Sequence, residues 1–277
     1  MLAAPERAQR PLPLLALLGC LAAGPAQAQQ RIVTVSPSLT DAVCALGYCD
    51  RIVGTDRYST GPGPVANLPK IGGMADASIE RIAALHPDLV LLGPRSRLDE
   101  RLAELGIPVQ TFVVRTHADQ QAMLRALGRT LGEPARAEAL IAKIERELDA
   151  AAARLPARLR GRSVYVEIGL GPKAASSATF IGETLTRLGL VNIVGGDLGL
   201  FPKINPEWIV RRRPELIVGP AAMLSNLAQR PGWAQLPAVQ GGRVCALDAE
   251  RMALLERPGP RLGEAAQMLV DCLRALP

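Results

Sequence analysis

The stretch Glu133–Leu155, EPARAEALIAKIERELDAAAARL, decides how the chain is organised. Pro134 fits the first turn of a helix, where its missing N–H is not needed, and no Gly or Pro follows until Pro156. Strong helix formers fill nearly every position. Apolar residues recur at three- and four-residue spacing, at Ala137, Ile141, Ile144, Leu148, Ala152 and Leu155. The pattern predicts one uninterrupted helix, roughly 30 Å long, with one apolar face.

Two fragments that flank this helix match each other in register. The first, Ser78–Leu91, reads SIERIAALHPDLVL, and the second, Asn205–Val218, reads NPEWIVRRRPELIV. Each predicts a short capped helix that is stopped by a proline and leads into a buried strand. One such match can arise by chance in an α/β chain. The long helix lies between the two copies, however, which favours two related lobes joined by a rod.

Short strands alternate with short helices on both sides of the long helix, as is typical of parallel sheets with crossover helices. We expect the first helix at Asp41–Leu46, and a loop between the strand Arg243–Leu247 and the closing helix Leu262–Leu276. We therefore predict an α/β protein with two lobes, each a short, mainly parallel sheet flanked by helices. The expected segments are an N-terminal lobe at 29–118, a linker with the long helix at 119–158, and a C-terminal lobe at 159–277.

Composition argues against a disordered protein and against a nucleic-acid-binding protein. Apolar residues make up 48% of the chain and charged residues 21%, which is typical of a folded globular protein. The net charge of +6 is spread along the sequence. Apart from Arg211–Arg213 there is no basic run, and basic residues do not alternate with aromatic ones. We therefore expect no nucleic-acid partner.

The N-terminus has the features of a targeting segment. Two arginines precede the apolar stretch Leu12–Ala23, which is short for a membrane span, and Ala26–Ala28 forms an A-x-A cleavage site. Residues 1–28 are therefore predicted to be a signal peptide that directs export to the periplasm. An alternative is the segment Leu17–Cys20, which resembles a lipoprotein box and would make Cys20 a lipidated N-terminus.

Export changes the interpretation of the cysteines. Four of the five remain after cleavage, at positions 44, 49, 245 and 272. An even number in an oxidising compartment indicates disulfides. The sequence does not prove the pairing, but Cys44–Cys49 would close a local loop and Cys245–Cys272 would join two late elements. Because there is no C-x-x-C and almost no histidine, we expect no metal site.

Signatures of enzymes are absent from the sequence. There is no G-x-S-x-G, no P-loop, and no G-x-G-x-x-G after a strand. His86 precedes a proline at an expected helix end, where a structural role is favoured over catalysis. The matched carboxylates Glu80 and Glu207 are expected in different lobes, too far apart for joint acid–base catalysis. We therefore predict no catalytic residue and no enzymatic activity.

The sequence resembles a known family, the helical-backbone substrate-binding proteins of ATP-binding-cassette importers. That group includes the periplasmic cobalamin-, haem- and ferric-siderophore-binding proteins. The resemblance spans essentially all of the mature chain and implies a monomer that delivers its ligand to an inner-membrane permease. Besides the two matched fragments, it is carried by RIVTVSPSLTDAVCALG from Arg31, DRYS from Asp56, FIGETLTRLGLVNIV from Phe180 and RPGPRLGEA from Arg257.

The resemblance also implies functional residues. In this family the ligand sits between the lobes, against loops that follow the strands, and each lobe presents one surface glutamate to the permease. The glutamates match Glu80 and Glu207, which as first-turn carboxylates also favour their helices. The ligand-binding positions match the segment Ala174–Ser177, Glu256, and the residues Ser36, Pro37, Arg57, Tyr58, Phe201, Arg251 and Arg257.

The identity of the ligand stays open at this stage. Tyr58 and Phe201 are the best-placed aromatic residues for cobalamin, whereas Trp208 and Trp233 are expected in the core. Arginines would suit an anionic ferric-siderophore. Haem would need an axial Tyr or His, which Tyr58 could supply. Free metal ions are disfavoured because histidines are scarce. We expect cobalamin or a ferric-siderophore as cargo, with no resident cofactor; haem, an exported sensor and an unrecognised hydrolase are the alternatives.

Overall fold

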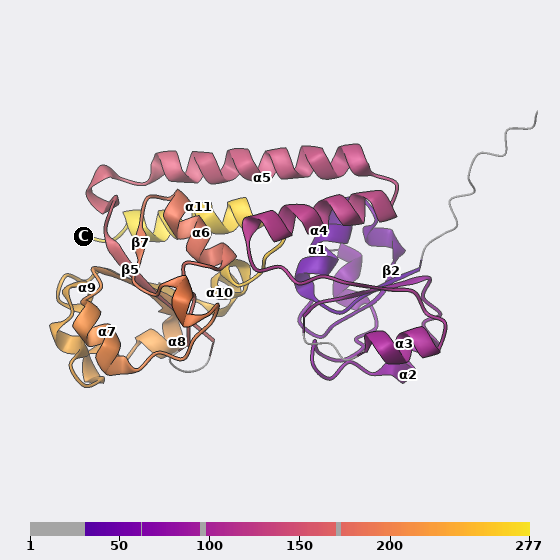
Figure 1. The fold of residues 1–277 in the computed structure, drawn as a ribbon, viewed down its shortest axis with the longest axis horizontal. Helices are drawn as coiled ribbons and strands as arrows, with labels where there is room; N and C mark the ends of the chain where they lie inside the picture. Colours follow the sequence, from indigo (N-terminus) through magenta and orange to yellow (C-terminus); the bar gives the residue numbers. More distant parts are fainter. Residues whose placement is uncertain (1–30, 62, 95–97, 170–172) are drawn as a thin grey trace, which may run out of the picture.

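The computed structural model describes residues 31–61, 63–94, 98–169 and 173–277, so the expected signal peptide and Cys20 lie outside the described residues. Two α/β lobes lie side by side along one long helix, α5 (Pro134–Arg154), which runs over both of them (Figure 1). The predicted long helix is therefore confirmed. Within the described residues, no helix is both long and apolar enough to cross a membrane.

The N-terminal lobe is built on a four-stranded parallel sheet. Its strands lie in the order β2-β1-β3-β4. They are β1 (Ile32–Thr34), β2 (Ile52–Thr55), β3 (Leu89–Leu92) and β4 (Val109–Thr111). The helices that connect them are α1 (Pro37–Ala45), α2 (Ile79–Ala84) and α3 (Asp99–Glu104).

The C-terminal lobe repeats this topology. Its parallel strands are β5 (Ser163–Ile168), β7 (Val191–Asn192), β8 (Leu216–Pro220) and β9 (Val244–Leu247). Both β7 and the short antiparallel β6 (Lys173–Ala174) pair with β5, on the side away from β8. The helices are α6 (Phe180–Arg187), α7 (Pro206–Arg212), α8 (Ala221–Leu224), α9 (Pro237–Gln240), α10 (Ala249–Leu255) and α11 (Leu262–Arg274). Without β6 the strand order is β7-β5-β8-β9, which matches that of the N-terminal lobe.

The two matched sequence fragments have the same structure. The side chains of Ser78 and Asn205 cap helices α2 and α7 by accepting backbone N–H groups. Each helix is followed by a left-handed residue before its proline: His86 has φ 45° and Arg213 has φ 49°. Left-handed backbone is unfavourable for residues other than Gly, so its recurrence at equivalent positions is informative. His86 thus lies just after the end of a helix, as expected.

The acidic residue after each proline also accepts an equivalent backbone hydrogen bond in both lobes. The Asp88 carboxylate accepts the backbone N–H of Arg31 at 2.7 Å. The Glu215 carboxylate accepts the backbone N–H of Ser163 at 3.0 Å. Arg31 and Ser163 stand at equivalent places, at the start of the strand beside β3 or β8. The internal match therefore reflects two related lobes.

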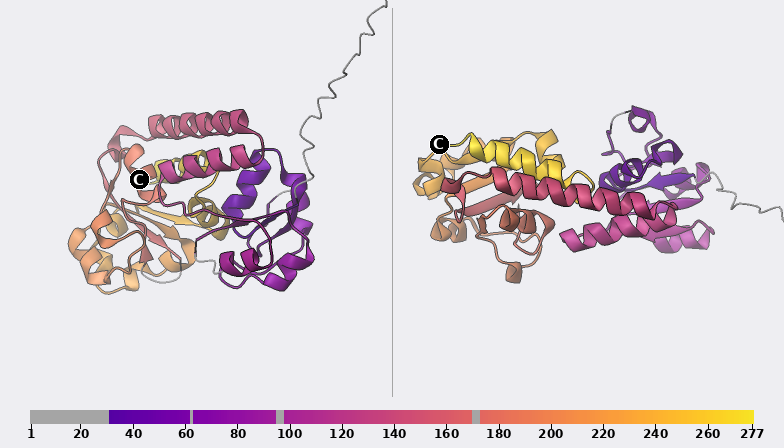
Figure 2. Two further views of the ribbon diagram at one scale, coloured as in Figure 1. Left: turned by 45° about the vertical axis from the view of Figure 1, so that its right-hand side comes forward. Right: turned by 90° about the horizontal axis from the view of Figure 1, so that it is seen from above.

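One continuous apolar core runs through both lobes. It contains one face of each sheet together with α1, α5, α6, α11 and a further helix, α4 (His117–Thr130), and includes Leu39, Leu124, Ile144, Leu185 and Leu269. The opposite face of each sheet has its own smaller core, around Ile82 in the N-terminal lobe and around Trp233 in the C-terminal lobe. The view from above shows α4, α5 and α11 side by side across the lobes (Figure 2). Helix α5 therefore packs one face, with Ile141, Ile144 and Leu148, on the core that both lobes share.

Three local expectations were wrong. Helix α1 begins at Pro37 and not at Asp41, because proline is well suited to the first helical position. Helix α4 was not expected; a capping box between Thr116 and Asp119 starts it, and it packs along α5. Helix α10 replaces part of the expected loop, and the Asp248 side chain caps it. Helices α4 and α10 thus begin at side-chain caps, whereas the Ser36 side chain makes no capping hydrogen bond at the start of α1.

Both expected disulfides, Cys44–Cys49 and Cys245–Cys272, are present. Trp233 is fully buried, as expected. Trp208 is only partly buried, and the Arg212 guanidinium lies 4.8 Å from its ring centroid.

Candidate functional site

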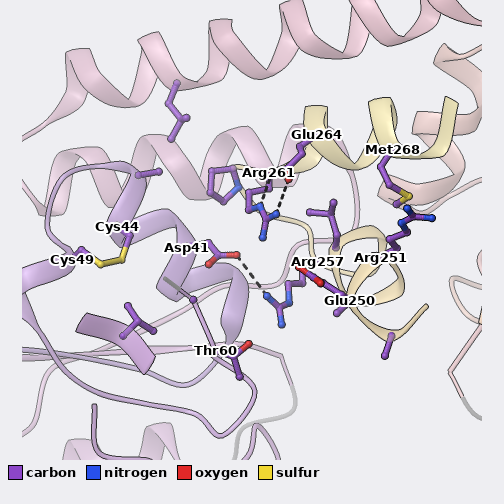
Figure 3. Close-up of a pocket in the computed structure, with 18 of the residues that line it drawn as sticks. Asp41, Cys44, Cys49, Thr60, Glu250, Arg251, Arg257, Arg261, Glu264 and Met268 are labelled. Atoms are coloured by element: carbon purple, nitrogen blue, oxygen red, sulfur yellow. Dashed lines mark hydrogen bonds and ion pairs between the residues drawn. A yellow bond between two sulfur atoms is a disulfide. The ribbon is translucent and has the colours of Figure 1, made fainter. Parts of the chain in front are cut away.

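A groove of about 1220 Å³ lies where the two lobes meet. The N-terminal lobe contributes α1 and the residues Thr60, Gly61 and Val65, and the C-terminal lobe contributes α10 and α11. Leu140 and Lys143 on α5 also line it. Figure 3 shows the acidic side chain of Asp41 on the N-terminal lobe and several charged side chains, both acidic and basic, on the C-terminal lobe. Apolar side chains such as Leu140, Leu254 and Met268 also line the groove, so it is a junction between the lobes with both charged and apolar walls.

Most of the cations in the groove already have acidic partners. The Arg261 guanidinium donates to both carboxylate oxygens of Glu264, at 2.7 Å each, and lowers the pKa of that carboxyl. Arg251 lies 3.6 Å from Asp248. These pairs lie within the C-terminal lobe, so they shape the groove without joining the lobes.

Arg257 is different, because it reaches the other lobe. Its Nη2 donates to the backbone carbonyl oxygen of Tyr58 at 3.2 Å, and its Nη1 lies 4.0 Å from Oδ2 of Asp41. Burial raises the pKa of Asp41, and the charge of Arg257 partly opposes this. Figure 3 shows this guanidinium facing Asp41. Arg257 thus connects the loop after α10 to α1 and to the loop after β2.

The Tyr58 loop is held from inside its own lobe. The fully buried carboxylate of Asp56 accepts the Tyr58 backbone N–H at 2.8 Å and the Ser59 hydroxyl at 2.5 Å. Burial raises the pKa of Asp56. The Tyr58 side chain is 52% exposed. Arg57 forms an ion pair with Asp76, and its guanidinium carbon lies 6.0 Å from the Tyr58 ring centroid. The hydrogen bonds to Asp56 therefore hold the backbone of the loop, and the exposed Tyr58 ring projects from it.

A buried hydroxyl network lies beneath this loop. The Thr40 hydroxyl is 2.8 Å from that of Ser59 and 2.6 Å from that of Thr34. All three side chains are buried. Sequence analysis did not identify this network, because its members lie on β1, on α1 and in the loop after β2. The network gives the Tyr58 loop satisfied polar contacts inside the lobe.

The structure places the seven predicted ligand residues in different surroundings. Arg251 and Arg257 line the groove, and Arg257 meets the Tyr58 loop. Ser36 and Pro37 are buried at the start of α1, where the Ser36 hydroxyl is 3.0 Å from that of Ser38. Phe201, on the loop before α7, is 38% exposed, and in the described part of the chain it makes no ring contact with Tyr58. A shared role in ligand binding stays a prediction.

Glu80 and Glu207 occupy the same position, one residue after the start of α2 and of α7. Both are exposed. The pKa of Glu80 is lowered by its own backbone N–H and by the Ser78 hydroxyl, which donates at 2.8 Å. Helices α2 and α7 both lie on the side of the lobes away from α5 (Figure 1). This arrangement is compatible with the predicted docking role.

A second inter-lobe contact lies at the start of α4. His117 donates its backbone N–H to the Glu183 carboxylate at 2.5 Å. Its ring Nε2 lies 3.1 Å from the Phe180 carbonyl oxygen and 2.9 Å from the Thr184 hydroxyl. Burial lowers the pKa of His117. Sequence analysis assigned no role to this histidine, because all three of its partners on α6 are distant in sequence.

Comparison with known proteins agrees with this architecture. The family model described as "Periplasmic binding protein" matches residues 32–251. A vitamin B12-binding protein of Yersinia pestis (strain Pestoides F) is 30% identical, covering 96% of this chain and 95% of its own length. A periplasmic haem-binding protein from Pseudomonas aeruginosa has a TM-score of 0.77 at 26% identity, covering 90% of this chain and 94% of that one. A haem-binding protein from Roseiflexus sp. RS-1 has a TM-score of 0.75 at 26% identity, covering 88% and 97%.

The resemblance stated from the sequence is confirmed by these matches. The two equivalent lobes and the long helix agree with the fold of the solved structures. The family model covers most of the chain, and its description supports a solute-binding role in import. The chain belongs to the periplasmic binding protein family.

Proposed function

We propose that this protein captures a corrinoid such as cobalamin between its lobes and delivers it to an inner-membrane permease. The observation that carries the proposal is the 30% identity to a vitamin B12-binding protein over nearly the full length of both chains. The metal chelate is cargo, so no resident cofactor and no catalytic step are needed.

Two exposed aromatic side chains support a large, partly apolar ligand. Tyr58 is 52% exposed on the N-terminal lobe, and Phe201 is 38% exposed on the C-terminal lobe. Only six of the 277 residues are Phe or Tyr, so two exposed rings on loops are a considerable share. Aromatic rings gain from contact with flat apolar surfaces, such as the face of a macrocycle.

Haem is the second candidate, and the Tyr58 hydroxyl favours it. Two structural neighbours are haem-binding proteins. Haem iron needs an axial protein ligand, usually His or Tyr. The Nε2 atom of His117 already contacts α6, and His86 lies at the end of α2. Tyr58 is thus the better axial candidate.

The third chelate expected from the sequence, an anionic ferric-siderophore, has less support. It would be recognised by arginines. Arg57 is already paired with Asp76, and Arg257 with Asp41 and the Tyr58 carbonyl. Binding an anion would therefore require these contacts to be exchanged.

The substitution Tyr58→Phe separates the two tetrapyrrole ligands. It keeps the aromatic face and removes only the hydroxyl. Mature protein is titrated with cyanocobalamin and with hemin, and binding is followed by absorbance and by thermal melting, since a ligand of the folded state raises the melting temperature. We expect cyanocobalamin to bind, with affinity in Tyr58→Phe within about threefold of wild type. Binding of hemin alone, lost in Tyr58→Phe, would replace the corrinoid proposal by haem.

Delivery needs a docking surface, and we propose Glu80 and Glu207 for it. Each lobe offers one exposed carboxylate at the same helical position, on the same side of the protein. Such a pair suits two basic sites on a permease with two-fold symmetry. If the protein were an exported sensor instead, it would have the same fold, but substitutions at these two residues would not change the uptake of a ligand.

A further inference from the structure

Arg257 is the first residue of a strongly constrained loop. Pro258 and Pro260 follow it, and each fixes one backbone angle. Between them, Gly259 packs against Ser38 of α1; a Cβ on this glycine would lie 3.4 Å from Ser38. The Gly259 carbonyl accepts a hydrogen bond from the buried amide of Gln120 on α4 at 3.3 Å. The loop is therefore docked on the N-terminal lobe, and the Arg257 side chain starts from a fixed point.

The guanidinium of Arg257 meets a peptide group that is held from its other end. The Tyr58 N–H is bound by Asp56 at 2.8 Å, from inside the N-terminal lobe. The Tyr58 carbonyl is bound by Arg257 at 3.2 Å, from the C-terminal lobe. The residue with the exposed ring is thus held at both backbone polar groups, once by each lobe. Hydrogen bonds to charged groups are stronger than neutral ones, so both restraints are substantial.

We infer that Arg257 is a positioning residue for Tyr58: it couples the placement of this ring to the docking of the two lobes and does not itself recognise the ligand. The Arg257 side chain is only 22% exposed, and Asp41 satisfies part of its charge. For the effect on ligand affinity, the inference rests on the proposed function. The positioning itself can be measured in ligand-free protein.

Fluorine NMR tests the positioning directly. The chain has three tyrosines, so protein labelled with 3-fluorotyrosine gives few signals, and Tyr58→Phe assigns the one of interest. We expect Arg257→Ala to shift or broaden the Tyr58 signal and to leave those of Tyr48 and Tyr165 in place. The matched control is Arg261→Ala, which removes the same charge four residues away, from a guanidinium whose acceptor is Glu264 in its own lobe. It should leave the Tyr58 signal unchanged.

A second variant separates positioning from charge. Arg257→Ala alone removes the stronger of the two arginine charges, those of Arg257 and Arg261, that act on the largely desolvated Asp41, which lowers stability for a different reason. Combining it with Asp41→Asn removes that charge and should recover much of the melting temperature. The altered Tyr58 signal should persist in this double variant. Its return to the wild-type position would overturn the inference, because the effect would then come from Asp41.

Affinity measurements complete the test. Titrated with cyanocobalamin, Arg257→Ala and the double variant should bind about tenfold more weakly than wild type, the size of one lost charge-assisted hydrogen bond. A weaker affinity with an unchanged Tyr58 signal would overturn the inference and make Arg257 a direct ligand contact. If wild-type protein binds no tetrapyrrole but the Tyr58 signal still moves in Arg257→Ala, the positioning role stands and the proposed function fails.

Discussion

Removing the two disulfides should destabilise the protein unequally. The Cys245–Cys272 bond closes a loop of 27 residues, and the Cys44–Cys49 bond closes one of 5. A cross-link restricts the unfolded chain, and the restriction grows with loop length. The chain-entropy relation gives about 3.5 kcal/mol for the longer loop and about 2 kcal/mol for the shorter one. We therefore expect the Cys245→Ala/Cys272→Ala variant to be the less stable of the two double variants.

The size of the effect can be followed by thermal melting. For a protein of this size, 1 kcal/mol corresponds to about 2–4 °C in melting temperature. The longer loop then predicts a loss of about 7–14 °C and the shorter one about 4–8 °C. Because one core runs through both lobes, we expect a single transition in circular dichroism, which is the condition for comparing melting temperatures.

Packing must be separated from cross-linking, because Cys245 is fully buried and alanine is smaller. Wild-type protein in a reducing agent keeps all four sulfur atoms and loses only the two bonds, so it serves as the control for the loss of packing. Titration of denatured, unreduced wild-type protein with a thiol reagent should find essentially no free thiol. Equal losses for the two double variants, or a larger loss for Cys44→Ala/Cys49→Ala, would refute the loop-entropy argument.

Three further predictions follow from the contacts between and around the lobes. Burial lowers the pKa of His117 below its usual 6.5, so the stability that the neutral ring contributes is present above pH 6.5 and is lost as pH falls through the lowered pKa. His117→Gln should therefore lose less stability than wild type between pH 7.5 and 5. Melting temperatures that fall in parallel with pH in the two proteins would contradict this. Glu80→Arg and Glu207→Arg should leave ligand affinity intact and impair uptake in a salt-dependent way, the double variant most, since rim charges mainly set orientation and association rate; wild-type uptake by the double variant would exclude the docking role. Because α5 packs one face on a core that both lobes share, ligand binding should leave the radius of gyration from small-angle scattering nearly unchanged, and a large decrease would indicate a hinge.

Local pattern was enough to predict much of the fold. The apolar stripe of Glu133–Leu155 predicts a helix because side chains three and four residues apart share one face, and the structure has that helix at Pro134–Arg154. The strand Ser163–Ile168 has β-branched and apolar side chains suited to a buried sheet. The matched fragments predict equivalent lobes because capping residue, proline and acid each act within a few residues or on the neighbouring strand. Helices α4 and α10 could have been found from their caps as well.

The site depended on contacts that no local pattern encodes. Sequence and family resemblance placed Arg257 near the ligand, but its hydrogen-bond partner, the Tyr58 carbonyl, is 199 residues away, and Asp41 is in the other lobe. A guanidinium can serve an anion, a carboxylate or a carbonyl equally well, so residue type does not select among them. Which partner Arg257 binds is decided by the packing of Gly259 against Ser38 and by the packing of α4, α5 and α11 in one core. The sequence by itself thus determined the long helix and the two equivalent α/β lobes, and only the tertiary structure decided which side chains meet between the lobes, because that depends on how the two sheets are docked.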